Sequence, residues 1–114
     1  MFASAGAAIF PDHWIKEGTW KNHRISWIET EHRHSERTAL LIHGFGACKE
    51  HWRHNVKALT GEHQVVALDL LGFGTSDKPP SILEGEQPNP EGVRYSIDLW
   101  ANQVVDFIAQ QGLT

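Results

Sequence analysis

The sequence predicts an α/β fold organised around a parallel βαβ unit, and three observations lead to this prediction. Residues 39–42 form an unbroken apolar run that ends at a turn over residues 43–46, as expected for a buried strand covered on both faces. An amphipathic helix pattern follows. A second apolar run, at residues 65–68, ends at Asp69. Because ligands of open α/β sheets bind at such strand ends, residues 38–47 are the first candidate for a site.

At 114 residues the chain is long enough for one domain and too short for two. Its Lys and Arg residues are scattered and its formal net charge is −4, so nucleic acid is not an expected partner. No window approaches the roughly 20 apolar residues of a transmembrane helix. A single cysteine, Cys48, excludes an internal disulfide framework and fits a reducing compartment. We therefore expect a cytoplasmic protein, or one of the plastid stroma if the source is a plant.

The N-terminal part is predicted to contain an arm and a hairpin. Residues 1–18 are interpreted as a loose arm, because their apolar opening lacks the basic region of a secretory signal. β-formers dominate residues 19–31, and Asn22-His23 offers a turn, so this segment is predicted to be a short hairpin. The polar residues 32–36 are predicted to form a second turn, after which the strand of residues 38–42 begins.

The first helix is predicted by Trp52, Val56 and Leu59, which recur at helical spacing with charged residues between them. It should run for about three turns and end near Gly61. The apolar strand at residues 64–70 follows it. Two strands joined by a helix form a parallel, right-handed βαβ unit.

The last third of the chain is predicted to contain a long loop and a second helix. Residues 71–80 are a rigid glycine and proline loop, and residues 81–94 lack periodicity, which predicts a long loop that is mobile in part. Ser96 can cap a helix whose apolar residues follow helical spacing, and Gly112 stands where a C-terminal glycine belongs. After strand, helix, strand and helix the pattern predicts another strand, so we expect the chain to be cut off within its fold.

Two glycine motifs resemble nucleotide-binding turns, but both are incomplete. Lys49 stands where a dinucleotide-binding turn that begins at Gly44 needs its third glycine, and Asp77 does so for the loop that begins at Gly72. Lys49 also lacks the preceding glycine of a P-loop. No cofactor is therefore expected. The histidine pairs of this sequence do not fit a zinc motif and have no evident third ligand, so no metal is expected either.

A nucleophile is also missing from the motifs. The nearest match to a nucleophile elbow, residues 74–78, lacks the final glycine, and Pro79 and Pro80 exclude the helix that must follow. Ser76 is therefore interpreted as a loop residue whose hydroxyl bonds the backbone.

The turn after the first buried strand has two interpretations. Glycines at 44 and 46 allow positive φ, so the N–H group of Phe45 can point into a cavity at the sheet edge as an oxyanion donor. The alternative is a plain strand-to-helix turn. On spacing alone the plain turn is favoured.

Taken together, three motifs resemble a known family. The residues His43-Gly44-Phe45-Gly46-Ala47, Trp52-Arg53-x-Asn55 and Asp69-Leu-Leu-Gly72-Phe-Gly74-x-Ser76-Asp77-Lys78-Pro79 are similar to the N-terminal third of the α/β-hydrolase superfamily. The nearest likeness is to pheophytinase-like hydrolases of plants and cyanobacteria. This resemblance implies an incomplete α/β-hydrolase sheet, an N-terminal β-hairpin plus βαβα, that is a three-layer sandwich when complete. Residues 19–114 would be the N-terminal portion of that domain, truncated before the nucleophile elbow.

The resemblance also implies roles for individual residues. In the family the residue after His-Gly supplies one oxyanion-hole N–H group, which would be that of Phe45. One group of supporting residues would brace this turn: His43, Gly44 and Gly46. A second group would shape the loop beneath the active site: Asp69, Gly72, Gly74 and Ser76. The family's nucleophile, acid and histidine come later in the chain, so none is expected here. Residues 84–92 look longer than usual and are interpreted as an unstructured insertion.

We therefore predict the N-terminal part of a hydrolase of ester or related acyl bonds, with a small apolar ester as substrate and no activity in the isolated chain. Epoxide hydrolases and haloalkane dehalogenases share these motifs but use an aspartate nucleophile, and the dehalogenases tend to place asparagine at the position of Phe45. An alternative is a non-catalytic binding or dimerising module. The strand of residues 39–42 would be an open apolar edge, which predicts marginal stability or self-association.

Overall fold

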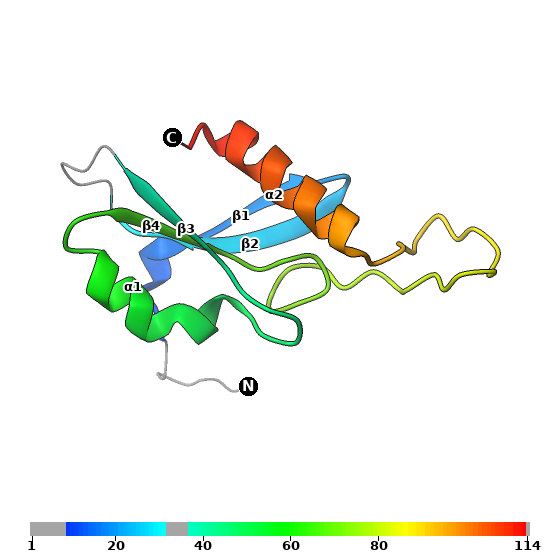
Figure 1. Cartoon of the computed structure of the whole chain (residues 1–114), viewed down its shortest axis with the longest axis horizontal. Helices are drawn as coiled ribbons and strands as arrows, with labels where there is room; N and C mark the ends of the chain where they lie inside the picture. Colours follow the sequence, from blue (N-terminus) through cyan, green and yellow to red (C-terminus); the bar gives the residue numbers. More distant parts are fainter. Residues whose placement is uncertain (1–8, 32–36, 114) are drawn as a thin grey trace.

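The computed structural model describes residues 9–31 and 37–113. Within them, four strands form one sheet with helices on both faces (Figure 1). The strand order is β1-β2-β4-β3, which places β3 at one edge. The strands are β1 (Ile15–Trp20), β2 (His23–Glu29), β3 (Thr38–Ile42) and β4 (Gln64–Leu68). The pairs β1/β2 and β2/β4 are antiparallel, whereas β3 and β4 are parallel, as predicted.

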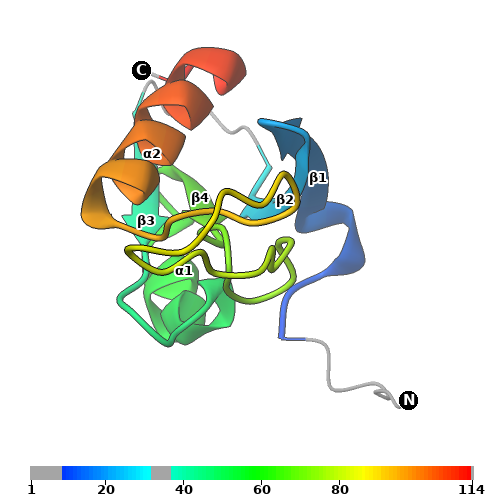
Figure 2. The same ribbon diagram turned by 90° about the vertical axis from the view of Figure 1, so that its right-hand side faces the viewer.

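The unbroken apolar runs are explained by cover on both faces of the sheet. On one face, Val66 and Leu68 of β4 pack in a cluster with Phe107 of α2 (Ile97–Gln111). On the other face, Val65 and Ala67 pack with Val56 of α1 (Arg53–Leu59). Figure 2 shows α2 and α1 on opposite sides of the strands. All four β4 residues are fully buried, so β4 is the central strand of the core.

The two predicted helices are present. The first begins as a 3-10 turn, η2 (Lys49–Trp52), and continues as α1, which ends two residues before Gly61. The second, α2, is capped as predicted: the Ser96 hydroxyl accepts the Leu99 N–H at 3.0 Å, and Gly112 has a φ of 63°.

The predicted start of the hairpin is wrong by four residues. β1 begins at Ile15, so residues 15–18 of the predicted loose arm are a strand, and a 3-10 turn, η1 (Asp12–Trp14), precedes them. The hairpin turn is centred on Lys21 and Asn22, which both have positive φ, rather than on Asn22-His23. The sequence did not indicate the start of β1, because this part of the strand carries charged residues that face solvent at the sheet edge. The predicted polar turn at residues 32–36 lies outside the described residues.

The long loop has no helix or strand, as predicted, but it is not an open, unstructured insertion. The Ile82 N–H donates to the Val93 carbonyl at 2.8 Å, and the Val93 N–H donates to the Pro80 carbonyl at 2.9 Å. These bonds close the base of the loop. Figure 1 shows the loop, in yellow, projecting beyond the sheet before the chain enters α2.

Candidate active site

The chain leaves β3 through a tight turn over residues 44–47. The Ala47 N–H donates to the Gly44 carbonyl at 3.1 Å, and Gly46, the third residue of the turn, has a φ of 80°. A positive φ at this position is typical of a type II turn and favours glycine. Gly44 is not among the residues with positive φ, so only Gly46 uses the conformational freedom that the sequence allows at both glycines.

Phe45 is the second residue of this turn and projects from the surface. Its side chain is 88% exposed, and its ring lies edge-on to Phe73 at 5.4 Å and to Trp100 at 6.4 Å between centroids. Its N–H group has no hydrogen-bond acceptor among the described residues. An unpaired backbone donor on a turn at a strand end is available to a bound group.

A pocket of about 350 Å³ opens beside the turn. Besides the turn itself, it is lined by residues from the end of β3, from the segment after β4 and from α2: Ile42, His43, Leu70, Phe73, Ile97, Trp100, Ala101 and Val104. This volume lies within the range of about 300–1,000 Å³ that is typical of small-molecule sites. The walls are apolar, so the pocket fits an apolar group whose polar end lies at the backbone of the turn.

His43 is committed to structure on both ring nitrogens. Nδ1 lies 2.8 Å from the Gly44 carbonyl, and Nε2 accepts the Leu70 N–H at 3.0 Å. A carbonyl only accepts and an N–H only donates, so the ring is the neutral tautomer with its proton on Nδ1. The residue is 3% exposed. His43 therefore ties the end of β3 to the segment after β4, and no free nitrogen remains for proton transfer.

Asp69 is the first residue after β4 and anchors the neighbouring loop, residues 69–80, which we call the Asp69 loop. It is fully buried, and its Oδ1 accepts the Lys49 N–H at 2.7 Å. Its Oδ2 accepts the Lys49 ammonium at 2.7 Å and the Thr75 N–H at 3.0 Å. Gly74, with a φ of 58°, passes so close that a Cβ there would overlap the carboxylate. A buried carboxylate with this many donors is a structural anchor.

Ser76 and Gly72 hold the same loop against its neighbours. The Ser76 hydroxyl donates to the Asp69 carbonyl at 2.8 Å and accepts the Ser26 N–H of β2 at 2.9 Å, as the loop interpretation of this serine predicts. Its hydroxyl is thus engaged, and it is 1% exposed. Gly72 has a φ of 94°, and a Cβ there would press on the ring of Tyr95.

Sequence reasoning missed Lys49 as a buried residue. Its side chain is 2% exposed, and its ammonium contacts Asp69 Oδ2, the Thr75 hydroxyl at 2.9 Å and Glu50 Oε2 at 3.1 Å. Burial acts to lower the pKa of Lys49, but the hydrogen bond and charge of Asp69 outweigh it, and the pKa is raised. The ammonium is therefore charged at neutral pH. Asp69 is 20 residues away, so local sequence gave no signal for this pairing.

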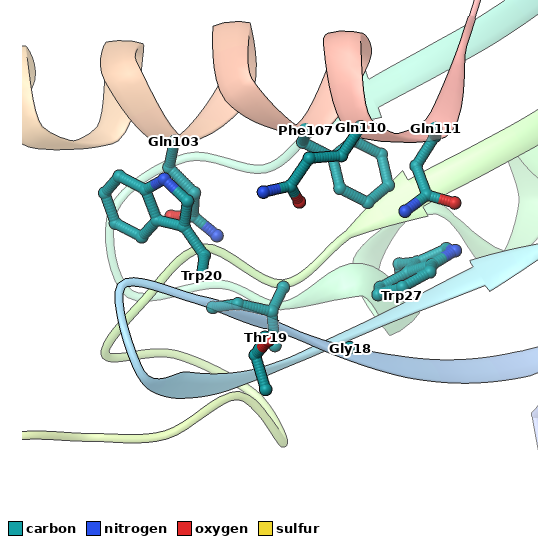
Figure 3. Close-up of a pocket in the computed structure, with 9 residues that line it drawn as sticks. Gly18, Thr19, Trp20, Trp27, Gln103, Phe107, Gln110 and Gln111 are labelled. Atoms are coloured by element: carbon teal, nitrogen blue, oxygen red, sulfur yellow. The ribbon is translucent and has the colours of Figure 1, made fainter.

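Gln103 is the second buried polar residue that the sequence did not reveal. Its side chain is 1% exposed and accepts the Leu71 N–H at 2.9 Å, which ties α2 to the segment after β4. Figure 3 shows Gln103 beside a cavity between the hairpin and α2, where Trp27 packs edge-on against Phe107. This cavity measures about 40 Å³, and among the described residues no titratable side chain lines it. It has room for little more than water and carries no reactive group.

The pocket beside Phe45 is thus where the described residues bring the predicted turn, the Asp69 loop and α2 together. No group of three or more metal-binding side chains occurs in the described part of the chain. Within the same residues, no helix is both long and apolar enough to cross a membrane.

The sheet with helices on both faces defines an α/β protein, and its pocket lies at the end of β3. Residues 39–113 match the family model described as the alpha/beta hydrolase fold. The chain therefore belongs to the α/β-hydrolase fold family, as its motifs predicted.

Individual relatives cover only part of the chain. Epoxide hydrolase 4 of Mus musculus is 50% identical over 40 residues, which are 35% of this chain and 11% of that protein. The 1-acylglycerol-3-phosphate O-acyltransferase ABHD5 of Mus musculus is 37% identical over 78 residues, 68% of this chain and 22% of that protein. A solved bacterial membrane phospholipase A, described as a virulence factor, is 35% identical with a TM-score of 0.63 and covers 84% of this chain and 28% of its own.

These relatives are much longer than the chain, which spans between a tenth and a third of their length. The likeness to pheophytinase-like hydrolases is finer than the family and stays a prediction.

Proposed function

We propose that this chain carries the oxyanion-side turn of an α/β-hydrolase that cleaves ester or related acyl bonds, with the Phe45 N–H as one of two donors. The observation that carries the proposal is the unpaired Phe45 N–H on a type II turn, at the end of β3 and beside an apolar pocket. In this proposal the nucleophile, acid and catalytic histidine belong to further parts of a longer protein. The 114 residues alone are then inactive.

The chemistry follows from where negative charge develops. When a nucleophile attacks the carbonyl carbon of an ester, the carbonyl oxygen becomes an oxyanion. A backbone N–H that is already fixed and unpaired stabilises this charge without reorganisation, and the second donor comes from the residue after the nucleophile. The apolar walls formed by Phe73 and Trp100 accept the acyl or alcohol part of the substrate.

We propose a small-molecule, apolar ester as the substrate class, because every side chain that lines the pocket outside the turn is apolar or aromatic except that of His43, whose ring nitrogens are already engaged. His43 takes no part in proton transfer, since both of its ring nitrogens are engaged. The supporting residues act through the turn and the Asp69 loop. A reducing, cytoplasmic location fits the single cysteine, Cys48.

The proposal is tested by removing the N–H donor of residue 45 from the turn. Phe45→Pro deletes the N–H group, and proline is favoured at the second position of a type II turn, so the turn itself is retained. Phe45→Ala is the matched control, because it removes the ring and keeps the donor. In the enzyme-length protein, Phe45→Pro should lower kcat for an aryl ester by roughly 100- to 1,000-fold. Equal kcat values for the two variants would exclude Phe45 as a donor.

The isolated chain provides a second test. An aryl ester assay on the 114-residue protein should give no turnover above buffer, because no hydroxyl of a nucleophile elbow is present among the described residues. Turnover by this chain alone would contradict the proposal. The assay must use protein free of host esterases. A Phe45→Pro preparation made in parallel is the control, because any turnover that it shows comes from contaminating enzyme.

A second candidate is an epoxide hydrolase, and the 50% identity to mouse epoxide hydrolase 4 over 40 residues favours it. Such an enzyme shares the turn and pocket but attacks with an aspartate. Parallel assays of an aryl ester and an aryl epoxide with the enzyme-length protein separate the two. Turnover of the epoxide without turnover of the ester would select the second candidate. Haloalkane dehalogenation is disfavoured by the phenylalanine at position 45.

A further inference from the structure

We propose that Lys49 is a positioning residue whose buried ion pair with Asp69 fixes the turn that presents the Phe45 N–H. The proposal rests on the role assigned above to that N–H group and extends the site to a side chain that does not line the pocket. Lys49 follows the turn and is the first residue of η2. It is thus placed to control the direction in which the chain leaves the turn.

The ammonium of Lys49 is fully paired. Its three acceptors are Asp69 Oδ2 at 2.7 Å, the Thr75 hydroxyl at 2.9 Å and Glu50 Oε2 at 3.1 Å. An ammonium has three donors, so each one finds a partner. The backbone N–H of the same residue donates to Asp69 Oδ1 at 2.7 Å. The main chain and the side chain of Lys49 therefore both hydrogen-bond to one carboxylate. The start of η2 cannot shift without breaking both of these bonds.

The turn is held at two points to the same neighbouring segment. On the β3 side, His43 Nε2 accepts the Leu70 N–H at 3.0 Å. On the η2 side, Lys49 binds Asp69, the residue before Leu70. Among the described residues, the hydrogen bonds of residues 44–47 stay within the turn or go to His43. The turn thus has no other polar restraint, and its orientation depends on these two anchors.

Stability alone does not account for an ion pair at this position. Replacing a buried ion pair with apolar residues is often neutral for stability, so the charge is weak evidence for a stabilising role. The ion pair instead fixes orientation. Because one carboxylate accepts from both the backbone N–H and the ammonium of Lys49, it sets the position at which the chain leaves the turn. Burial acts to lower the pKa of Lys49, but Asp69 raises it, so burial does not discharge the ammonium and both bonds to Asp69 persist at neutral pH.

The test measures the turn directly in the 114-residue chain. Backbone ¹⁵N relaxation gives an order parameter for Phe45 and Gly46 in the wild-type chain and in Lys49→Met, which fills the same space without charge. Rigid backbone has an order parameter of about 0.85 and flexible backbone less than about 0.6. We expect the wild-type turn near the first value, Lys49→Met below the second, and the β4 amides unchanged. Lys57→Met is the matched control, because Lys57 is an exposed α1 lysine that forms no salt bridge with any described residue.

Each outcome decides the proposal. A folded Lys49→Met chain whose Phe45 order parameter equals that of the wild type would overturn it, as would a flexible turn in the wild type. If Lys49→Met does not fold, Glu50→Gln removes only the outer acceptor, whose side chain is 31% exposed, and should produce the same change to a smaller extent. No change at the turn in Glu50→Gln would then count against the proposal.

Kinetics separates this proposal from the proposed function. In the enzyme-length protein, Lys49→Met should lower kcat for an aryl ester by roughly 10- to 100-fold, with KM changed less than about twofold, because misplacement of a donor affects the transition state. If Phe45→Pro leaves kcat unchanged while Lys49→Met loosens the turn, the proposed function fails and the anchor is real. If Phe45→Pro abolishes turnover and Lys49→Met leaves kcat unchanged, Lys49 does not position the donor.

Discussion

The two edges of the sheet are built differently. β1 carries Lys16 and Glu17 on exposed positions, whereas β3 carries no charged residue and all five of its positions are half-buried. Charges on an edge strand discourage pairing with another strand. β1 therefore has the composition of a solvent-exposed edge strand, whereas β3 has the composition of an interior strand. The difference indicates that the β3 edge is made to be covered.

The contrast continues in the loops beside each edge. Near β1 and β2, the Asp77 carboxylate accepts the Arg24 N–H at 2.7 Å and Asp106 accepts the Trp20 indole N–H at 2.8 Å. Near β3, Phe45 and Ile97 are 88% and 78% exposed. We call the first region the closed half, and it comprises η1, β1, β2, the Asp69 loop and the face of α2 that packs on them. We call β3 and its turn the open half. Changes in the closed half should cost stability, and changes in the open half should cost function.

The largest expected contrast is between two glycines. Gly74→Ala forces a left-handed residue and pushes a methyl group onto the Asp69 carboxylate, which must then leave its donors. Strain and a broken buried ion pair together should cost roughly 4–5 kcal/mol. Gly44→Ala, where a Cβ meets nothing within 4 Å, should cost less than about 0.5 kcal/mol. Urea unfolding measures both. Similar midpoints for the two variants would break the comparison.

Two phenylalanines give the next contrast. Phe107 is 4% exposed and packs at 5.0 Å against Trp27, so Phe107→Ala should destabilise the chain by about 3–4 kcal/mol. Phe45→Ala removes a ring that is 88% exposed and should change the free energy of unfolding by less than about 0.5 kcal/mol. Thermal unfolding followed by circular dichroism tests the pair. A large loss in Phe45→Ala would mean that its ring supports the core through Phe73 and Trp100.

What the sequence reveals here depends on how local the cause is. The runs at β3 and β4, the Ser96 cap and the Gly112 stop were predictable because each follows from neighbouring residues. β1 was missed at its start because an exposed edge strand lacks the apolar alternation that marks a strand.

The site was predictable only in part, for a related reason. The turn and its glycines are local, and a family resemblance supplied the role proposed for Phe45. The burial of Lys49 and Gln103 depends on Asp69 and Leu71, which are 20 and 32 residues away. The pocket needs Phe73 and Trp100 beside the turn, an arrangement that only the packed chain defines.

The two sheet edges can be compared by association. We expect the isolated chain to self-associate through β3, as its open edge predicts. Thr38→Lys adds a charge at that edge and should weaken association by roughly tenfold, an effect of about 1.4 kcal/mol. Thr19→Lys on the exposed β1 edge is the control and should change nothing. Sedimentation over a concentration series measures both. A sharp monomer at every concentration, with cooperative unfolding, would contradict an open β3 edge.

The smallest expected effect is electrostatic and belongs to the closed half. Glu31 Oε1 lies 2.6 Å from His13 Nε2, and this hydrogen bond is the largest of several contributions that lower the pKa of Glu31 from 4.5 to about 2. A lowered carboxyl pKa contributes stability above the ordinary value, and that stability is lost as the pH falls from about 4.5 towards 2. Both side chains are largely exposed, so the effect should be small and weakened by salt. Titration of the Glu31 side-chain carboxyl by NMR checks the pKa, and Glu31→Gln should flatten this part of the stability profile. A Glu31 pKa near 4.5 at low salt would show that the pair does not tie η1 to the end of β2, and the closed half would then begin at β1.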